Sequence, residues 1–129
     1  MKTTLAEFKK LNLLDSLNQS IKDLGLKNPT DIQTHVIPTF LEGQSVVGVS
    51  NTGSGKTLAY ALPILHVLKK LENEDKGVTT PAQPRALVMV PTRELGEQVA
   101  KVFKSLTHHT RLRVRVALGG MSFADSRKN

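Results

Sequence analysis

The segment from Ser50 to Thr57 combines glycines, a lysine and a hydroxyl in the order that binding of a polyphosphate requires. Gly53 and Gly55 allow the backbone to fold tightly around an anion, so that consecutive N–H groups point at phosphate oxygens. A helix that begins near Lys56 adds the positive end of its dipole. We therefore predict that this segment is a P-loop.

Two side chains of the loop carry the chemistry. Lys56 is placed to reach the β and γ phosphates and is the candidate catalytic residue, and the hydroxyl of Thr57 is the candidate Mg²⁺ ligand. Ser50 stands where the general pattern has glycine, but an apolar run before the loop and an apolar helix after it supply the expected context. The predicted nucleotide-binding residues of the loop are Asn51, Thr52, Gly53, Ser54, Gly55, Lys56 and Thr57.

The composition limits the class of protein. The chain has 129 residues and a formal net charge of +7, which favours a nucleic acid or another polyanion as partner, although a solvated basic surface is an alternative. It has no cysteine, which excludes disulfides and thiolate metal sites, and its histidines lack a convincing ligand spacing. We expect no membrane insertion and a cytoplasmic location, with the nucleus as the alternative.

The hydrophobic pattern places helices and strands around the loop. Apolar residues recur at helical spacing over 14–24 and 30–41, with Gly25 as a stop and Thr30 as an N-cap, and again over 58–71 and 95–106. Short apolar runs at 46–49 and 86–90, and alternating apolar residues at 112–116, are typical of strands. This alternation predicts an α/β fold with a mostly parallel sheet flanked by helices, and a ligand at the carboxyl ends of the strands.

The last predicted strand alternates apolar residues with Arg111, Arg113 and Arg115. Such alternation is typical of a half-buried strand with a basic outer face. These arginines are placed either to contact a phosphate backbone or to form a solvated face that discourages edge pairing. The second interpretation is the more common one for such a stripe.

Further motifs in the expected order make this chain resemble the N-terminal, RecA-like half of a DEAD-box RNA helicase. Residues 25–33 (GLKNPTDIQ) are similar to the Q motif of that family, and the P-loop is similar to its A-x-T-G-S-G-K-T form. Residues 91–95 (PTREL) look like motif Ia, and Gly119 and Gly120 match its paired glycines. The resemblance implies a Q-motif helical region at 1–44 and the first part of a RecA-like ATP-binding domain at 45–129.

The resemblance also indicates which residues contact adenine and which contact RNA. It implies that Gln33 reads adenine, so that ATP is preferred over GTP, because a side-chain amide offers one donor and one acceptor. Phe8 resembles the isolated aromatic upstream of the motif, or else is a hydrophobic staple, and Leu26 stands where the family usually has an aromatic beside the base. The implied contacts with single-stranded or locally duplex RNA come from Pro91, Thr92, Arg93, Gly119 and Gly120.

The D-E-A-D and S-A-T motifs of the family are not among the 129 residues. We therefore expect a fold truncated before the D-E-A-D motif, a chain that binds ATP or ADP with Mg²⁺ but is inactive alone, and a parent enzyme that is an ATP-dependent RNA helicase. The alternatives are a naturally short, non-catalytic binding module and another P-loop enzyme such as a small-molecule kinase.

The resemblance also bears on stability. It implies that the P-loop strand lies between two strands that the 129 residues do not contain, so that residues 46–49 would present two unpaired edges. Each unmade buried hydrogen bond costs about 1–3 kcal/mol. We therefore expect either marginal stability, or self-association, or pairing with a separate piece of the same domain.

Overall fold

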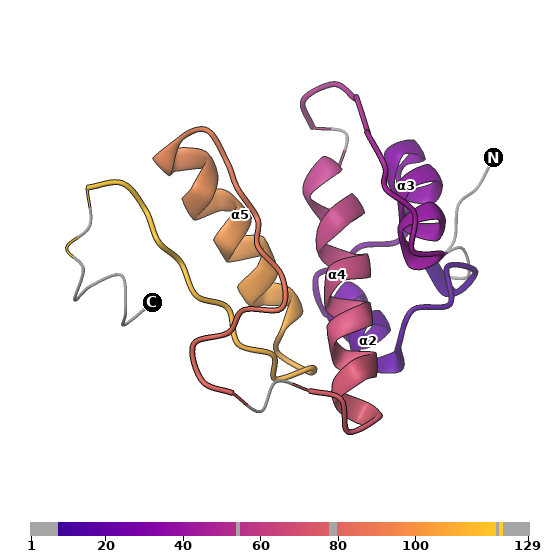
Figure 1. Ribbon diagram of the computed structural model, residues 1–129. Helices are drawn as coiled ribbons and strands as arrows, with labels where there is room; N and C mark the ends of the chain where they lie inside the picture. Colours follow the sequence, from indigo (N-terminus) through magenta and orange to yellow (C-terminus); the bar gives the residue numbers. More distant parts are fainter. Residues whose placement is uncertain (1–7, 54, 78–79, 121, 123–129) are drawn as a thin grey trace.

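The computed structural model describes residues 8–53, 55–77, 80–120 and 122. The helices whose bounds it gives are α2 (Asp15–Asp23), α3 (Asp31–Leu41), α4 (Lys56–Asn73) and α5 (Arg93–Leu106). α4 lies between α3 and α5, and α2 contacts both α4 and α5 (Figure 1). The four helices predicted from the hydrophobic pattern are confirmed, with ends that differ by a few residues.

Local signals set the helix ends near the Q motif. Gly25 follows α2 with a φ of 70°, and its N–H donates to Lys22 O at 2.9 Å while the next amide donates to Ile21 O at 3.1 Å. This pair of bonds is a Schellman motif, which requires the left-handed conformation that glycine adopts without strain. Thr30 then occupies the N-cap position of α3.

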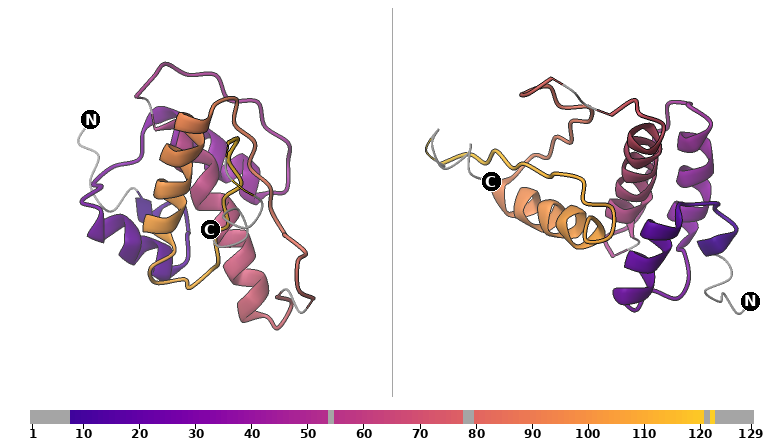
Figure 2. Two further views of the ribbon diagram at one scale, coloured as in Figure 1. Left: turned by 90° about the vertical axis from the view of Figure 1, so that its left-hand side faces the viewer. Right: turned by 90° about the horizontal axis from the view of Figure 1, so that it is seen from below.

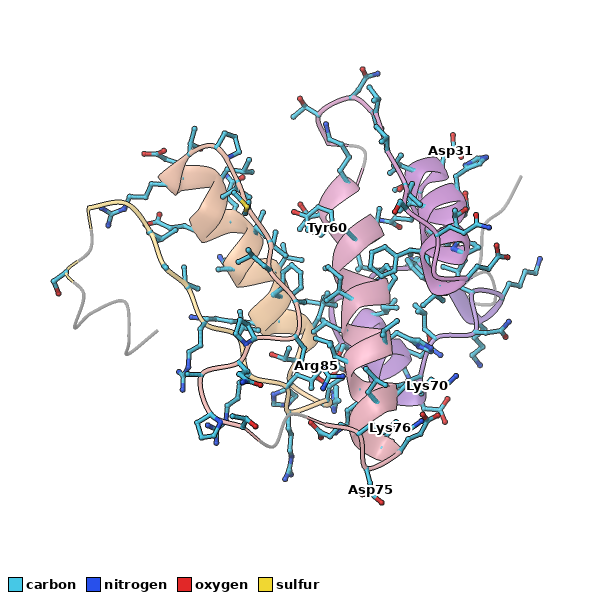
Figure 3. All side chains as sticks on the ribbon, in the orientation of Figure 1. Asp31, Tyr60, Lys70, Asp75, Lys76 and Arg85 are labelled. Carbon is cyan, nitrogen blue, oxygen red and sulfur yellow. The ribbon has the colours of Figure 1, made fainter. Side chains whose placement is uncertain are left out.

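One hydrophobic core joins the two predicted regions of the chain. Phe8 and residues of α2 and α3 are buried together with residues of α4 and α5, so the part before residue 45 packs on the part after it. Tyr60 lies on the side of α4 that faces α5, with its ring centre 6.2 Å from that of Phe103 (Figure 3). The largest fully buried apolar side chains are Phe8, Leu17, Ile21, Ile37, Leu62 and Leu106.

The three predicted strands, unlike the four helices, are not found as paired strands among the described residues. Residues 46–49, 86–90 and 112–116 are extended, but none of the described residues belongs to a strand, and these segments exchange no backbone hydrogen bonds. The mostly parallel sheet is therefore not seen in the described part of the chain. The physical reason is that an extended segment becomes a strand only when a neighbour pairs with its N–H and C=O groups.

The positions of these segments explain why residues 46–49 do not pair with the other two. Residues 46–49 lie beside α3, where the Cα of Gly48 approaches so closely that an added Cβ would be 3.2 Å from Ile32 Cδ1. Residues 86–90 and 112–116 lie on the other side of α4, with α5 (Figure 2). The first segment leaves Val47 and Val49 93% and 89% exposed, and the second leaves Leu87 and Met89 78% and 84% exposed.

Polar contacts tie α2 to the rest of the molecule. Ser20 Oγ donates to Leu106 O at 3.0 Å, and His109 Nε2 lies 2.6 Å from Asp23 Oδ2. The hydrogen bonds from His109 and Gln19 lower the pKa of the Asp23 carboxyl. In the described residues, no helix is long and apolar enough to cross a membrane.

His66 of α4 makes a contact that depends on its charge. Its Nδ1 accepts the N–H of Leu14, the residue before α2, at 3.2 Å. A protonated imidazole has no free acceptor nitrogen, so protonation breaks this bond. Burial, with a smaller effect from Lys70, lowers the pKa of His66 below its ordinary value.

This contact predicts that acid destabilises the fold. Because the folded-state pKa of His66 is depressed, its contribution to stability is complete above the unfolded value of about 6.5 and is lost as pH falls below it. In thermal melts from about pH 7.5 to 5.5, His66→Asn should lose less stability than the wild type, because asparagine keeps an acceptor but does not titrate. The matched variant His35→Asn, at an exposed histidine, should show the wild-type loss. An equal loss in His66→Asn would contradict the assignment.

Candidate functional site

The P-loop is an exposed turn that leads into α4. Gly53 and Gly55 have φ values of 80° and 85°, so both adopt the left-handed conformation that the sequence predicts for them. Gly55 is the N-cap of α4, which begins at Lys56. The backbone N–H groups of the first turn of α4 therefore face the loop, as an anion site requires.

The predicted functional side chains of the loop lie at this helix start. Lys56 Nζ donates to Ser50 O at 2.6 Å, so this hydrogen bond connects the end of the loop to its first residue. Thr57 is half-buried, and its hydroxyl has no hydrogen-bond partner among the described residues. Asn51, Thr52 and Gly53 are exposed, and Ser54 lies outside the described residues.

Gln33 connects the Q motif to the P-loop. Its Oε1 accepts the N–H of Thr30 at 2.9 Å, which is one half of a capping box, and its Nε2 donates to Gly55 O at 3.1 Å. The side chain is only 2% exposed. A single buried amide therefore contacts both the start of α3 and Gly55, the P-loop residue that caps α4.

The contact between Gln33 and the P-loop leaves no room for a side chain at position 55. A Cβ added to Gly55 would lie 2.4 Å from Gln33 Nε2 and 3.0 Å from Thr30 Oγ1. Thr30 Oγ1 is itself buried and has no hydrogen-bond partner within the described part of the chain. Gly55 is therefore required for its conformation and also for the close approach of α3.

The structure places the other two predicted adenine-side residues against the core. Phe8 is 1% exposed and belongs to the hydrophobic core, and Leu26 is half-buried and packs on that core. The described contacts of the P-loop with the Q-motif region come from Thr30 and Gln33. The adenine contacts of Phe8 and Leu26 stay predictions.

The structure brings motif Ia and the paired glycines together. Arg93 Nη1 donates to Gly119 O at 3.3 Å, and a Cβ at Gly120, whose φ is 84°, would lie 3.1 Å from the same nitrogen. Arg93 also pairs with Glu97 at 3.4 Å, with both side chains about half exposed. These motifs, 26 residues apart, form one polar surface at the start of α5.

The start of α5 explains the local geometry of motif Ia. Thr92 is the N-cap of α5, and its Oγ1 accepts the N–H of Leu95 at 3.2 Å. Pro91 is exposed just before it. The Thr92 hydroxyl that was predicted to contact RNA therefore already serves the helix as an acceptor, which leaves its proton free to donate.

Sequence analysis missed two contacts that organise the site. One is the bond between Gln33 and Gly55, and the other is the bond between Arg93 and Gly119. The T-x-x-Q spacing of Thr30 and Gln33 signals the capping box but not the second bond of the amide. Within the described residues, no group of acidic, histidine or cysteine side chains is arranged to hold a metal ion.

Comparison with known proteins shows the family of this chain. The family model described as "DEAD/DEAH box helicase" matches residues 30–129, a stretch that contains the P-loop, motif Ia and the paired glycines. The chain belongs to the DEAD/DEAH box helicase family. This membership decides against a small-molecule kinase as the interpretation of the P-loop.

Curated relatives of this DEAD/DEAH box helicase chain match it over almost its whole length. It is 43% identical over 92% of its residues to DEAD-box ATP-dependent RNA helicase 39 of Arabidopsis thaliana. It is 42% identical over 94% of its residues to the ATP-dependent rRNA helicase rrp-3 of Neurospora crassa. The matched part is only 19% and 22% of the length of these relatives, so the chain spans about a fifth of each.

Solved structures of DEAD-box proteins share the fold. A DEAD box protein from Methanococcus jannaschii is 33% identical, with a TM-score of 0.80 over 95% of this chain and 31% of its own. The RNA helicase Prp28 from Chaetomium thermophilum, solved bound to ADP, is 28% identical, with a TM-score of 0.80 over 98% of this chain and 30% of its own. These similarities support the expected RecA-like fold of the chain.

The buried amide of Gln33 yields a stability prediction. Gln33→Ala leaves the Thr30 N–H without its partner and leaves the Gly55 carbonyl with only the N–H of Ala59, so the free energy of unfolding should fall by about 1–3 kcal/mol. Urea denaturation measures this loss. The matched control Gln19→Ala removes an exposed amide that bonds Asp23 at 3.1 Å and should change stability by less than about 0.5 kcal/mol. Equal effects of the two substitutions would contradict the role of Gln33.

Proposed function

We propose that this chain is the ATP- and RNA-binding N-terminal portion of a DEAD-box ATP-dependent RNA helicase. The observation that carries the proposal is the bond from Gln33 to Gly55, which joins a residue suited to adenine to the loop suited to phosphates. The curated relatives, which are named as ATP-dependent RNA helicases, support the same assignment for the parent protein.

The nucleotide site fits a magnesium complex of ATP or ADP. Lys56 and the amides at the start of α4 neutralise the β and γ phosphates, and the Thr57 hydroxyl, which has no partner among the described residues, is available to the ion. Bound Mg²⁺ supplies charge neutralisation between the phosphates. The bond from Lys56 to the Ser50 carbonyl holds the ammonium inside the loop before nucleotide arrives.

Gln33 keeps the capacity to read adenine while it holds the loop. Its Oε1 has a second lone pair after it accepts from Thr30, and its Nε2 has a second N–H after it donates to Gly55. These two groups complement the N6 donor and N7 acceptor of adenine. Guanine presents an acceptor in place of N6, so ATP is preferred over GTP.

The RNA site is the surface formed by motif Ia and the paired glycines. Thr92 offers its hydroxyl proton, Arg93 offers a guanidinium, and Gly119 and Gly120 allow a sugar-phosphate backbone to approach the main chain. Backbone contacts carry no base information, so binding is independent of sequence. RNA-stimulated hydrolysis and strand separation belong to the parent enzyme, and we expect negligible turnover by this chain alone.

The architecture of the parent domain completes the proposal. We infer that the extended segments 46–49, 86–90 and 112–116 are strands of a mostly parallel sheet once neighbouring strands pair with them. Residues 1–44 then form the Q-motif helical region, and residues 45–129 form the first part of the RecA-like domain. Their shared core is consistent with one folding unit.

Nucleotide binding tests the P-loop. Lys56→Ala removes the mobile cation that faces the phosphates and should weaken binding of ATP with Mg²⁺ by more than about tenfold. Isothermal titration calorimetry measures the effect. The control Lys22→Ala removes an exposed lysine of α2 and should leave the affinity unchanged. Unchanged ATP affinity in Lys56→Ala would overturn the assignment of the nucleotide site.

RNA binding tests the second surface. Binding of a single-stranded oligonucleotide should be weak, independent of sequence and steeply dependent on salt, because the described surface offers few phosphate contacts and no reader of base edges. Arg93→Ala should lower the affinity and reduce the salt slope by about one phosphate contact. Fluorescence anisotropy at several salt concentrations measures both. Tight binding to one sequence at high salt would count against the proposal.

A further inference from the structure

A cleft with a volume of about 410 Å³ lies between α5 and the residues just before the paired glycines. Its floor is made of half-buried apolar side chains, which are Ala100, Val116 and Leu118. Its wall is made of charged side chains of α5, which are Arg93, Glu97, Lys101 and Lys104. The cleft therefore combines an apolar floor with a wall that has an excess of two positive charges.

The four charged side chains of the wall form one stripe on α5. Positions 93, 97, 101 and 104 follow one another at intervals of four, four and three residues, which places them on one side of a helix. We call these four side chains the α5 stripe. The side that α5 buries carries Gly96, Val99 and Phe103. These three residues line the space beside residues 86–90 and 112–116, whereas the described lining of that space contains no member of the stripe. Strands that pair with those segments therefore leave the α5 stripe uncovered.

The two lysines of the α5 stripe are free to bind an anion. In the part of the chain that the structure describes, neither ammonium makes a hydrogen bond or an ion pair. Glu97 pairs with Arg93 at 3.4 Å, and because both side chains are about half exposed, this ion pair is weak enough for a phosphate to compete with it. A lysine in the last turn of a helix is favourable in itself, which accounts for Lys104 but not for Lys101.

The α5 stripe begins at the surface formed by motif Ia and the paired glycines. Arg93 belongs to both, because its guanidinium donates to Gly119 O at 3.3 Å and also lines the cleft. A helix rises about 1.5 Å per residue, so Lys104 lies about 16 Å further along α5 than Arg93. A stacked nucleic acid strand advances about 3.4 Å per nucleotide, so this length corresponds to about five nucleotides.

We propose that the cleft and the α5 stripe extend the RNA site, so that a single strand bound at motif Ia and the paired glycines continues along α5 to Lys104. Lys101 and Lys104 contact phosphates, and the apolar floor contacts the face of a base or a ribose. A duplex hides its base faces, so the floor favours a single strand. This inference rests on the proposed RNA surface and extends it beyond the motifs. The shared Arg93 favours RNA over an acidic peptide as the occupant.

Labelled oligouridines of two lengths test the extension with the full chain. A short RNA of about four nucleotides covers the surface of motif Ia and the paired glycines, and a long RNA of about ten nucleotides also reaches the α5 stripe. Fluorescence anisotropy at several salt concentrations gives the affinity and the salt slope for each RNA. We expect the long RNA to bind more tightly, with a salt slope steeper by about 1.4, because each phosphate contact of a single strand contributes about 0.7.

Variants of the chain locate the extension. The stripe variant, Lys101→Ala with Lys104→Ala, should weaken the long RNA by more than about fivefold at low salt and remove the additional salt slope, while the short RNA changes by less than about twofold. The control variant, Lys22→Ala with Lys70→Ala, removes the same charge from exposed positions of α2 and α4 and should leave both RNAs unaffected. Binding of an RNA duplex of about ten base pairs should fall less in the stripe variant than binding of the long single strand.

The possible results separate this inference from the proposed function. If the short RNA binds and Arg93→Ala weakens it, but the stripe variant binds the long RNA as the control variant does, the extension is wrong and the RNA surface stands. If the wild type binds neither RNA, the RNA surface is wrong and the extension falls with it. An equal loss for a glutamate decapeptide would show a general anion patch in place of an RNA site, and an equal loss for the duplex would remove the role of the apolar floor.

Discussion

The bond between the Gln33 side chain and the Gly55 carbonyl is the constraint on which the nucleotide site depends. The Gln33 amide is buried, so losing this hydrogen bond would cost more free energy than losing one at the surface. The bond can form only while α3 and the P-loop keep their relative position, and it therefore stabilises that position. The left-handed φ of Gly55 and its missing Cβ make that approach sterically possible. We therefore propose that recognition of the base and recognition of the phosphates are coupled through the Gln33 side chain.

The P-loop and the start of α5 each hold a cation by a hydrogen bond to a backbone carbonyl. At the P-loop, a lysine returns to a carbonyl of its own loop, and at the start of α5 an arginine reaches the carbonyl of Gly119. In both places a cation is held beside glycine backbone that a phosphate can approach. We propose that the same arrangement binds a nucleotide at the P-loop and a nucleic acid backbone at the start of α5.

The sequence predicts the helices and their caps well because those signals are local. Gly25 and Thr30 act within a few residues of their positions, and the apolar spacing of α5 matches the side chains that it buries. Strands depend on a partner that the local sequence does not contain, so residues 46–49 and 112–116 could be predicted as extended but not as paired. Likewise, the motifs identify Gln33 and Arg93, but their bonds to Gly55 and Gly119 arise only from packing between distant segments.

The most direct test of the account is a calorimetric titration of the wild-type chain with ATP and with GTP, each in Mg²⁺. The coupled site predicts that ATP binds with measurable heat and that GTP binds at least about tenfold more weakly, because the free donor and acceptor of Gln33 match adenine. Equal affinities for the two nucleotides would contradict the role of Gln33. Absence of binding by either would contradict the nucleotide site itself.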